Sequence, residues 1–442
     1  MNVLILGSGA REHAFALKIR KSKKCNKLYV APGNAGTSLV ANNLNVSISD
    51  FQAVKNLIIE YNIQLLIIGP EIPLINGIYN YIKNDTELNN VLVIGPSKLG
   101  AKLEGSKDFS KEFMLRNSIP TAPYKTFDQN SVEEGIKYLS TINPPYVLKA
   151  DGPAAGKGVL ILDNLKIAQN ELFNMIAKNK FGKSGSKVVV EGFLKGIESS
   201  CFVLVDNKNY LILPSAKDYK RIGIGDTGLN TGGMGSISPV PFDDKEFQTK
   251  VEERIVKPTL SGIIKENLNY VGFLFIGIIK VGNDPYVIEY NVRMGDPETQ
   301  VVLPRIKNDF LELLLSTING NLDTVKLEVD KKTFVNVVLA SGGYPETYEN
   351  GKFIDGLQHS HDSIILHAGT KNEDGKIFTN GGRVLSIVSS SNNIKSALKK
   401  SYETIKKIDF QGKYFRPDIG FDLQKWVCCL VRIFFVSFWK TN

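Results

Sequence analysis

The chain has 442 residues, of which 43% are hydrophobic, and a net charge of +9 with a pI near 9.0. This length permits about three domains with cores of their own. No basic run is interleaved with aromatic residues, so the positive charge argues against nucleic-acid binding and favours anionic small molecules. The cysteines fit neither a disulfide framework nor a zinc site, which favours a reducing, cytoplasmic location.

The first hundred residues alternate short apolar runs with helical patterns. The runs lie at residues 3–6, 28–30, 65–68 and 91–94, and most of them end in Gly or Pro turns. Such alternation predicts parallel βαβ units, whose ligands bind at the carboxyl ends of the strands. We therefore expect an N-terminal α/β substrate-binding domain over residues 1–103, and no leader segment before it.

The turn at residues 7–13 joins the first strand to a helix, whose N-terminus can bind a phosphate. It is a weak dinucleotide fingerprint, because Glu12 replaces the third glycine and the second strand ends without a carboxylate for a ribose. Arg11 favours a single phosphate instead, while a purely structural turn remains the alternative. His13 taken alone is more typical of a packed or capping histidine than of a base.

Residues 104–325 contain most of the glycine-rich loops, and strand patterns at 144–149 and 187–191 predict a smaller subdomain, at about 120–192, that closes over a ligand. The loop at 149–159 follows Lys149 and is rich in small residues. Its backbone amides can approach phosphates closely and Lys157 can neutralise them. The spacing does not match a Walker A motif, and a flexible hairpin tip is the alternative.

The segment 286–298 is the most informative one. Side chains alternate faces along a strand, so Glu289, Asn291 and Arg293 are expected on one face. Two oxygen ligands and a guanidinium on one face suit a magnesium–nucleotide site. A solvated polar strand face is the alternative interpretation.

The glycine-rich loop at 226–235 follows Lys220 and Arg221, and it predicts a mobile cover over a site, with a plain surface loop as the alternative. Residues 326–422 form a third, β-rich region. In the tail at 423–442, the stretch 426–439 is apolar except for Arg432 and Ser437. It is shorter than the about 20 residues of a membrane helix, so no membrane span is expected. A docked helix, an interfacial anchor and a non-native extension remain open.

Taken in this order, the segments resemble the ATP-grasp superfamily and, within it, the phosphoribosylamine–glycine ligase family. The resemblance extends over residues 1–422. The run Arg-Met-Gly-Asp-Pro-Glu-Thr-Gln at 293–300 is similar to the family signature, with Met294 where Phe is usual. Further similar segments lie at 9–13, 32–36, 69–71, 103–107 and 367–370. The tail at 423–442 matches nothing in the family.

The resemblance implies an α/β fold with an N-terminal Rossmann-like parallel-sheet domain, a central two-subdomain ATP-grasp fold and a C-terminal mixed β-rich domain. It implies ATP-dependent ligation of glycine to 5-phosphoribosylamine through glycyl phosphate, giving glycinamide ribonucleotide, ADP and phosphate in de novo purine biosynthesis. The implied cofactors are ATP and Mg²⁺ or Mn²⁺. The implied partners are small-molecule substrates only, and we expect a monomer or weak dimer.

The resemblance also assigns roles to particular residues. The expected nucleotide contacts are Lys107, Lys149, Gly156, Lys157, Glu191, Phe193, Leu194, Glu198, Lys220 and Asn230. The expected substrate contacts are Gly9, Arg11, Glu12, His13, Asn34, Gly36, Glu71, Gly295 and Asp296. The expected metal ligands are Glu289 and Asn291, and the expected catalytic residues are Arg293, Lys149 and Asp218.

Three other functions compete with this one. Another ATP-grasp ligase could act on a different carboxylate and amine. A nicotinamide-dependent oxidoreductase built on the first domain is disfavoured by the missing ribose carboxylate. A non-catalytic nucleotide-binding protein is disfavoured because metal ligands and phosphate-binding lysines are both present.

Overall fold

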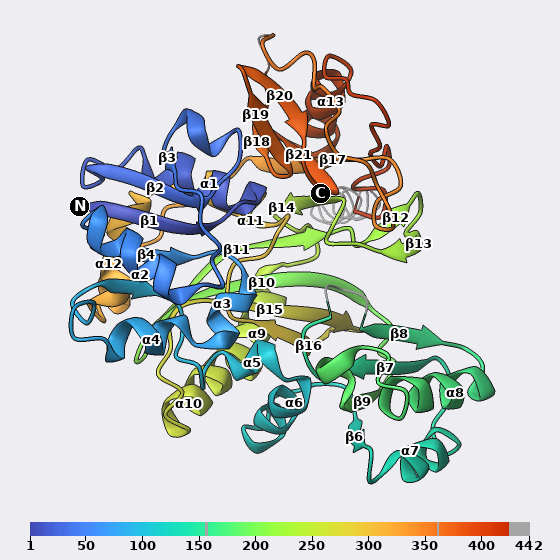
Figure 1. Cartoon of the computed structure of the whole chain (residues 1–442). Coiled ribbons are helices and arrows are strands. Elements are labelled where there is room, and N and C mark those ends of the chain that lie inside the picture. The colour runs from blue at the N-terminus through green and yellow to red at the C-terminus, as the bar shows by residue number, and fades with distance from the viewer. Residues whose placement is uncertain (155–157, 360–361, 424–442) are drawn as a thin grey trace, which may run out of the picture.

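The computed structural model describes residues 1–154, 158–359 and 362–423. The N-terminal region and the small four-stranded sheet lie beside a long central sheet, to which the third region adds strands (Figure 1). The expected contacts Gly156 and Lys157 and the tail from 424 onward lie outside the described residues. Within the described part of the chain, no helix has the length and apolar character that a membrane crossing requires.

The N-terminal region is a five-stranded parallel sheet in the order β3-β2-β1-β4-β5. Val3 to Leu6 in the central strand are fully buried, because an apolar run suits a strand with both faces covered. This confirms the expected N-terminal parallel sheet. The strands are β1 (Asn2–Gly7), β2 (Lys27–Pro32), β3 (Asn42–Asn43), β4 (Leu65–Ile68) and β5 (Leu92–Ile94). The helices are α1 (Ala10–Ile19), η1 (Thr37–Leu39), α2 (Phe51–Glu60), α3 (Glu71–Asn76) and α4 (Ile78–Asn84).

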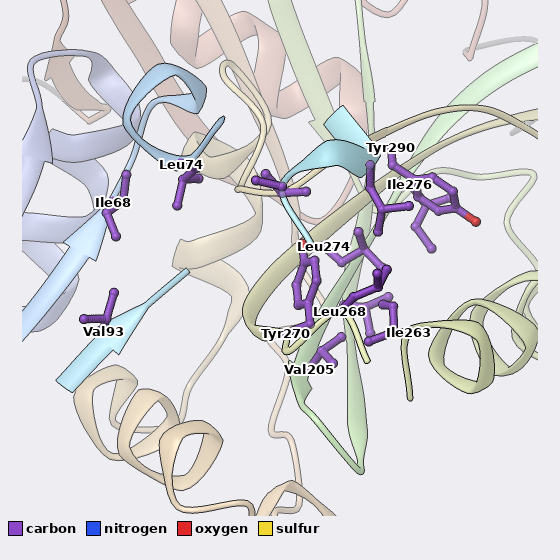
Figure 2. Packing of buried hydrophobic residues seen from close by; sticks show 14 of the residues in the cluster. Ile68, Leu74, Val93, Val205, Ile263, Leu268, Tyr270, Leu274, Ile276 and Tyr290 are labelled. Carbon is purple, nitrogen blue, oxygen red and sulfur yellow. The ribbon is translucent and has the colours of Figure 1, made fainter. Parts of the chain in front are cut away.

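The first region and the central sheet share one hydrophobic core. Figure 2 shows Ile68 and Val93 of the first sheet in the same cluster as Tyr270, Leu274 and Ile276. Leu274 and Ile276 belong to a strand of the central sheet, and Tyr270 lies just before that strand. Helices α5 (Lys102–Gly105) and α6 (Lys107–Arg116) follow this contact and lead into the small subdomain. The shared core therefore sets the position of the first region relative to the central sheet.

The small subdomain is a four-stranded antiparallel sheet in the order β6-β9-β7-β8. Leu148, Leu172 and Val190 are fully buried in a separate core beneath its two main helices. A separate core permits the subdomain to move as a unit. Its elements are β6 (Tyr124–Asp128), α7 (Val132–Leu139), β7 (Tyr146–Ala150), β8 (Val159–Leu162), α8 (Leu165–Ile176), η2 (Gly182–Gly185) and β9 (Lys187–Gly192).

The central sheet has eight strands in the order β16-β15-β10-β11-β14-β17-β21-β18. Five of its strands come from the residues before 325, namely β10 (Ile197–Asp206), β11 (Tyr210–Asp218), β14 (Gly235–Ser238), β15 (Val271–Val281) and β16 (Asp284–Asn291). Between β11 and β14 lies the hairpin of β12 (Arg221–Gly223) and β13 (Thr227–Asn230). The helices around this part are α9 (Lys245–Val251), η3 (Glu252–Val256), α10 (Lys257–Lys265), α11 (Thr299–Val302), η4 (Leu303–Arg305), α12 (Phe310–Ile318) and η5 (Leu322–Thr324).

The third region adds strands to this sheet and also contains a separate two-stranded sheet. Strand β14 pairs with β17, with Ser236 opposite Asn336, so the sheet crosses the expected domain boundary at 325. The domain division therefore stays a prediction. The elements of the third region are β17 (Thr333–Ala340), β18 (Ile364–His367), β19 (Thr370–Glu373), β20 (Lys376–Thr379), β21 (Arg383–Ser391) and α13 (Ile394–Ile405).

Candidate active site

A cavity of about 890 Å³ lies where the small subdomain, the central sheet and the first region meet. Its wall includes most of the residues assigned from the sequence. These are Arg11, Glu71, Lys107, Lys149, Glu191, Phe193, Leu194, Glu198, Asp218, Lys220, Asn230, Glu289, Asn291, Arg293, Gly295 and Asp296. Residues separated by nearly three hundred positions in the sequence therefore line one space.

Buried lysines dominate one side of the cavity. Lys149, at the end of β7, places its Nζ 2.9 Å from Glu191 Oε2. Lys107 begins α6, whose N-cap Ser106 accepts a hydrogen bond from the Phe109 amide. Burial lowers the pKa of Lys107, which shows that its charge is poorly solvated. Anionic phosphate groups would relieve this cost.

Lys220 lies on the central-sheet side of the cavity. Its Nζ donates to Glu198 Oε2 and lies 3.4 Å from Asp218 Oδ1. Burial lowers the pKa of Lys220, but Asp218 and Glu198 more than offset this and raise it well above its ordinary value. Lys220 therefore remains charged beside two carboxylates. The same lysine, through its charge, lowers the pKa of Glu198.

The segment after β16 brings the predicted polar face into the cavity. Arg293 Nη2 lies 3.1 Å from Asn291 Oδ1 and 2.9 Å from Glu104 Oε1, and its Nε lies 3.4 Å from Glu71 Oε2. Burial lowers the pKa of the guanidinium, but Glu104 and Glu71 raise it above its ordinary value. Arg293 is thus a permanently charged group oriented from several sides.

Glu289 and Asn291 fit a divalent cation. Both line the cavity with Lys107 and Lys149 close to the same wall. One carboxylate and one amide oxygen are a sufficient protein contribution to Mg²⁺, which usually completes its shell with phosphate and water. Among the described residues, no cluster of three or more His, Cys, Asp or Glu side chains offers an all-protein metal cage. The donor set therefore suits a metal that arrives with a phosphorylated ligand.

Two charged residues of the first region, Arg11 and Glu71, reach the cavity. Arg11 Nη1 donates to Met294 O at 3.2 Å, and its Nε lies 2.7 Å from Glu12 Oε1. Glu12 itself accepts from the Gly9 amide at 2.6 Å. A Cβ at Gly69 would lie 1.9 Å from Glu12 Oε1, so only glycine fits there. Glu12 and Gly9 are thus placed behind Arg11 rather than in the cavity wall.

His13, Asn34 and Gly36 lie at the junction with the third region, outside the cavity lining. The Asn34 amide donates to Ser8 O and His367 O, both at 2.8 Å, and accepts from the Gly36 amide at 2.8 Å. Its hydrogen-bonding capacity is thus largely used within the protein. His13 Nδ1 accepts from the His367 amide at 2.9 Å. The assigned substrate role of these residues stays a prediction.

Burial keeps both histidines of this junction uncharged. It lowers the pKa of His13 to about 3, with His367 adding to the effect, and that of His367 to about 4. Their rings lie 5.7 Å apart. A proton on His13 Nδ1 would remove the acceptor of the His367 amide, so the junction requires the neutral form.

The segment 226–235, expected to be a mobile cover, makes several contacts with the third region. Part of it is the β12–β13 hairpin, and the third region ties it down at several points. Arg383 Nη1 donates to Gly232 O at 2.6 Å, and the Gly232 amide donates to Tyr344 Oη at 2.9 Å. The fully buried Arg416 donates to Asp226. The segment is thus a wall of the cavity with several hydrogen bonds to the third region, and its expected role as a mobile cover stays a prediction.

Sequence reasoning did not assign several residues that line the cavity: Lys111, Lys217, Glu298, Tyr344 and Arg383. Glu298 lies in the motif at 293–300, and Arg383 directly follows Gly381 and Gly382, so a charge in or beside a glycine-containing turn was the available signal. Lys111 follows Lys107 by one helical turn, which places both on one face of α6. Burial, with Asp218 adding to it, raises the pKa of Glu298 to about 7. Tyr344 has no such signal.

The four-stranded sheet over a cavity of lysines, opposite a strand that offers Glu289 and Asn291, defines an ATP-grasp protein. The biotin carboxylase of Campylobacter jejuni shares this fold, with a TM-score of 0.72 at 15% identity over 94% of this chain and 93% of that one.

Models of the phosphoribosylglycinamide synthetase family match most of the chain. The N domain matches residues 1–104, the ATP-grasp (A) domain 105–299 and the C domain 334–422. The phosphoribosylamine–glycine ligase of Fusobacterium nucleatum is 42% identical over 95% of this chain and 98% of its own length. That of Caldanaerobacter subterraneus is 43% identical over 95% and 99%.

A solved structure agrees with these relatives. The crystal structure of the phosphoribosylamine–glycine ligase of Thermotoga maritima superimposes with a TM-score of 0.82 at 37% identity, over 95% of this chain and 100% of that one. The chain belongs to the phosphoribosylamine–glycine ligase family. The recognised resemblance and the expected fold class are confirmed.

Proposed function

We propose that this chain ligates glycine to 5-phosphoribosylamine at the expense of ATP in de novo purine biosynthesis. The observation that supports this most is a single cavity that contains phosphate-binding lysines, Glu289 with Asn291, and Arg293, in a chain with full-length relatives that carry this enzyme's name. A chain of this family that had lost the ligase activity would not need to keep these three features together.

The mechanism has two steps. The carboxylate of glycine attacks the γ-phosphoryl group of ATP, giving glycyl phosphate and ADP. The amine of phosphoribosylamine then attacks the acyl carbon, and phosphate and a proton leave as the amide of glycinamide ribonucleotide forms. Both nucleophiles are reactive in themselves, so the protein has to position them and neutralise charge.

Each part of the cavity has a role in this scheme. Lys107, Lys149 and Lys220 bind phosphates, Glu191, Phe193 and Leu194 hold adenine, and Glu198 binds the ribose. Arg293 clamps the transferring phosphoryl group. Glu289 and Asn291 would hold Mg²⁺ or Mn²⁺, which would neutralise phosphate charge when bound. Asp218 and the turn of Gly295 and Asp296 border glycine, and Arg11 and Glu71 take part in binding phosphoribosylamine.

The small subdomain excludes water from the acyl phosphate. It has its own core and carries Lys149 at the cavity edge, whereas the 226–235 segment is held by the third region. We therefore assign closure to the subdomain as a whole. We also propose that the enzyme is cytoplasmic and that it is a monomer or weak dimer. Sedimentation of the purified protein would test the oligomeric state.

The function is tested by mixing ATP, glycine and freshly made phosphoribosylamine with the purified protein and measuring glycinamide ribonucleotide by mass spectrometry. ADP release is measured with each substrate alone and with both. Product is expected only with the complete set. ADP formed with another carboxylate and amine, but not with this pair, would contradict the proposal.

A further inference from the structure

One carboxylate in the cavity wall bridges two buried lysines, and only one of them has been given a role so far. Glu191 Oε2 lies 2.9 Å from Lys149 Nζ, and its Oε1 lies 3.2 Å from Lys111 Nζ. The exposed fractions are 4% for Glu191, 5% for Lys149 and 2% for Lys111. These three side chains form what we call the Lys111–Glu191–Lys149 bridge.

The outer end of the bridge is fastened to the strand that carries the metal ligands. Lys111 Nζ donates to Thr121 Oγ1 at 2.7 Å, and Thr121 Oγ1 donates to Val287 O at 2.7 Å. The Val287 amide donates to Pro120 O at 2.8 Å. Val287 belongs to β16, whereas Glu191 belongs to β9 of the small subdomain. Lys111 therefore connects the phosphate-binding side of the cavity with its metal-binding side.

The stability of the fold does not account for a lysine at this position. Burial lowers the pKa of Lys111 to about 8, although Glu191 opposes the effect. Removing one partner of a buried ion pair is costly when it leaves the other charge unpaired, but Lys149 already pairs with Glu191 at 2.9 Å. A second lysine is therefore not needed to neutralise Glu191. The charge of Lys111 therefore requires a reason other than packing.

We propose that Lys111 is a positioning residue for ATP. Lys111 pairs with one oxygen of Glu191, so that Lys149 keeps donors free for the phosphates. This inference rests on the proposed function only in that ATP binds in this cavity. An ammonium group has three donors, and Glu191 takes up one of those of Lys149 through a single oxygen. Without Lys111, both oxygens of Glu191 are available to Lys149, and the bridge loses its net positive charge.

The test is the Lys111→Met variant of the full chain. Its affinity for Mg²⁺ with a non-hydrolysable ATP analogue, measured by isothermal titration calorimetry, is expected to fall about tenfold. The KM for ATP should rise by a similar factor, the KM for glycine should change less than twofold, and the melting temperature should stay the same or rise. Lys137→Met, at an exposed lysine of α7, is the matched control and should behave as the wild type.

Thr121 gives a second, milder test if Lys111→Met does not fold. Thr121→Val removes the acceptor of Lys111 and should weaken nucleotide binding, whereas Thr121→Ser keeps the hydroxyl and should not. Unchanged analogue affinity in Lys111→Met, or in Thr121→Val where only that variant folds, would overturn the inference. An equal rise in the KM for ATP and in the KM for glycine, together with a lower melting temperature, would also overturn the inference, because this result indicates a purely structural role. If the wild type makes no glycinamide ribonucleotide but the affinities respond as stated, the proposed function fails and this inference stands.

Discussion

Arg293 shows how much a single side chain in this cavity depends on its neighbours. Its guanidinium is oriented by Glu104 at 2.9 Å and by Asn291 at 3.1 Å, two residues that lie far apart from each other in the sequence. A cation fixed in this way needs no reorganisation when charge develops on a transferring phosphoryl group. Positioning of this kind is costly to lose.

The first prediction concerns the charge of Arg293. Arg293→Ala should lower the rate of ADP formation with both substrates present by about 10² to 10³, the range found when a preorganised charge-stabilising donor is removed. Arg254→Ala, which removes a partly exposed arginine paired with Asp284 at the surface, is the control. A rate close to that of the wild type in Arg293→Ala would mean that it does not clamp the phosphoryl group.

The second prediction concerns the metal. Glu289→Gln replaces the only carboxylate of the proposed ligand pair by an amide of the same size, so a higher concentration of Mg²⁺ should be needed for half-maximal activity. The increase is expected to be about tenfold or more, since weakened ligand sets typically cost this much in metal affinity. Activity is measured across a titration of MgCl₂ at saturating ATP. An unchanged titration curve would count against Glu289 as a ligand.

At the scale of elements, the β12–β13 hairpin and the segment after it depend on the third region. Tyr344 Oη accepts from the Gly232 amide at 2.9 Å, and Arg383 Nη1 donates to Gly232 O at 2.6 Å. Arg383 also lies 3.4 Å from Asp296 Oδ1 and helps to lower the pKa of that buried carboxyl. The third region thus holds the 226–235 segment of the cavity wall, although it contributes few of the other residues that line the cavity.

The third prediction tests this attachment. Tyr344→Phe removes one hydroxyl acceptor, and we expect a loss of kcat/KM of about five- to tenfold, equivalent to about 1 kcal/mol for one hydrogen bond. Amide exchange of the 228–235 peptide should become faster. Tyr348→Phe, whose ring packs against that of Tyr344 at 6.1 Å, is the control. Unchanged exchange in Tyr344→Phe would show that the hydroxyl does not hold the segment.

At the scale of the whole molecule, the first and third regions meet through a buried polar junction. The His367 amide donates to His13 Nδ1, and the Asn34 amide donates to His367 O. A Cβ at Gly36 would lie 2.7 Å from the Cβ of His367, so the first and third regions approach too closely there for a side chain at this position. These contacts connect residues that are more than three hundred positions apart.

The fourth prediction is the pH dependence of stability at this junction. The pKa of His13 lies at about 3 in the folded protein, below its ordinary value of 6.5, because the ring is buried. The unfolded chain therefore binds more protons than the folded chain between these values. Stability from the neutral ring is complete above pH 6.5 and is lost as the pH falls towards 3, by up to about 1.4 kcal/mol per pH unit for one proton.

His13→Gln keeps an acceptor but cannot take up this proton. Urea unfolding at pH 6.0, 5.0 and 4.5 should show a shallower decline of the unfolding free energy for this variant than for the wild type. His359→Gln, at an exposed histidine, is the control and should decline like the wild type. Equal slopes for His13→Gln and the wild type would indicate that the junction tolerates a charged imidazole.

The sequence by itself determined the parallel sheet of the first region, because apolar runs at 3–6 and 65–68 can only be buried on both faces, and it indicated the Glu289, Asn291 and Arg293 face through strand alternation. Only the tertiary structure decided that Lys111 bridges to Glu191, that the 226–235 segment is fastened by Tyr344 and Arg383, and that His13 and Asn34 contact the third region. The physical reason is the separation along the chain over which each effect acts. Alternation and turn chemistry act between neighbours in the chain, whereas the partners of a buried charge are chosen by the packing of distant elements.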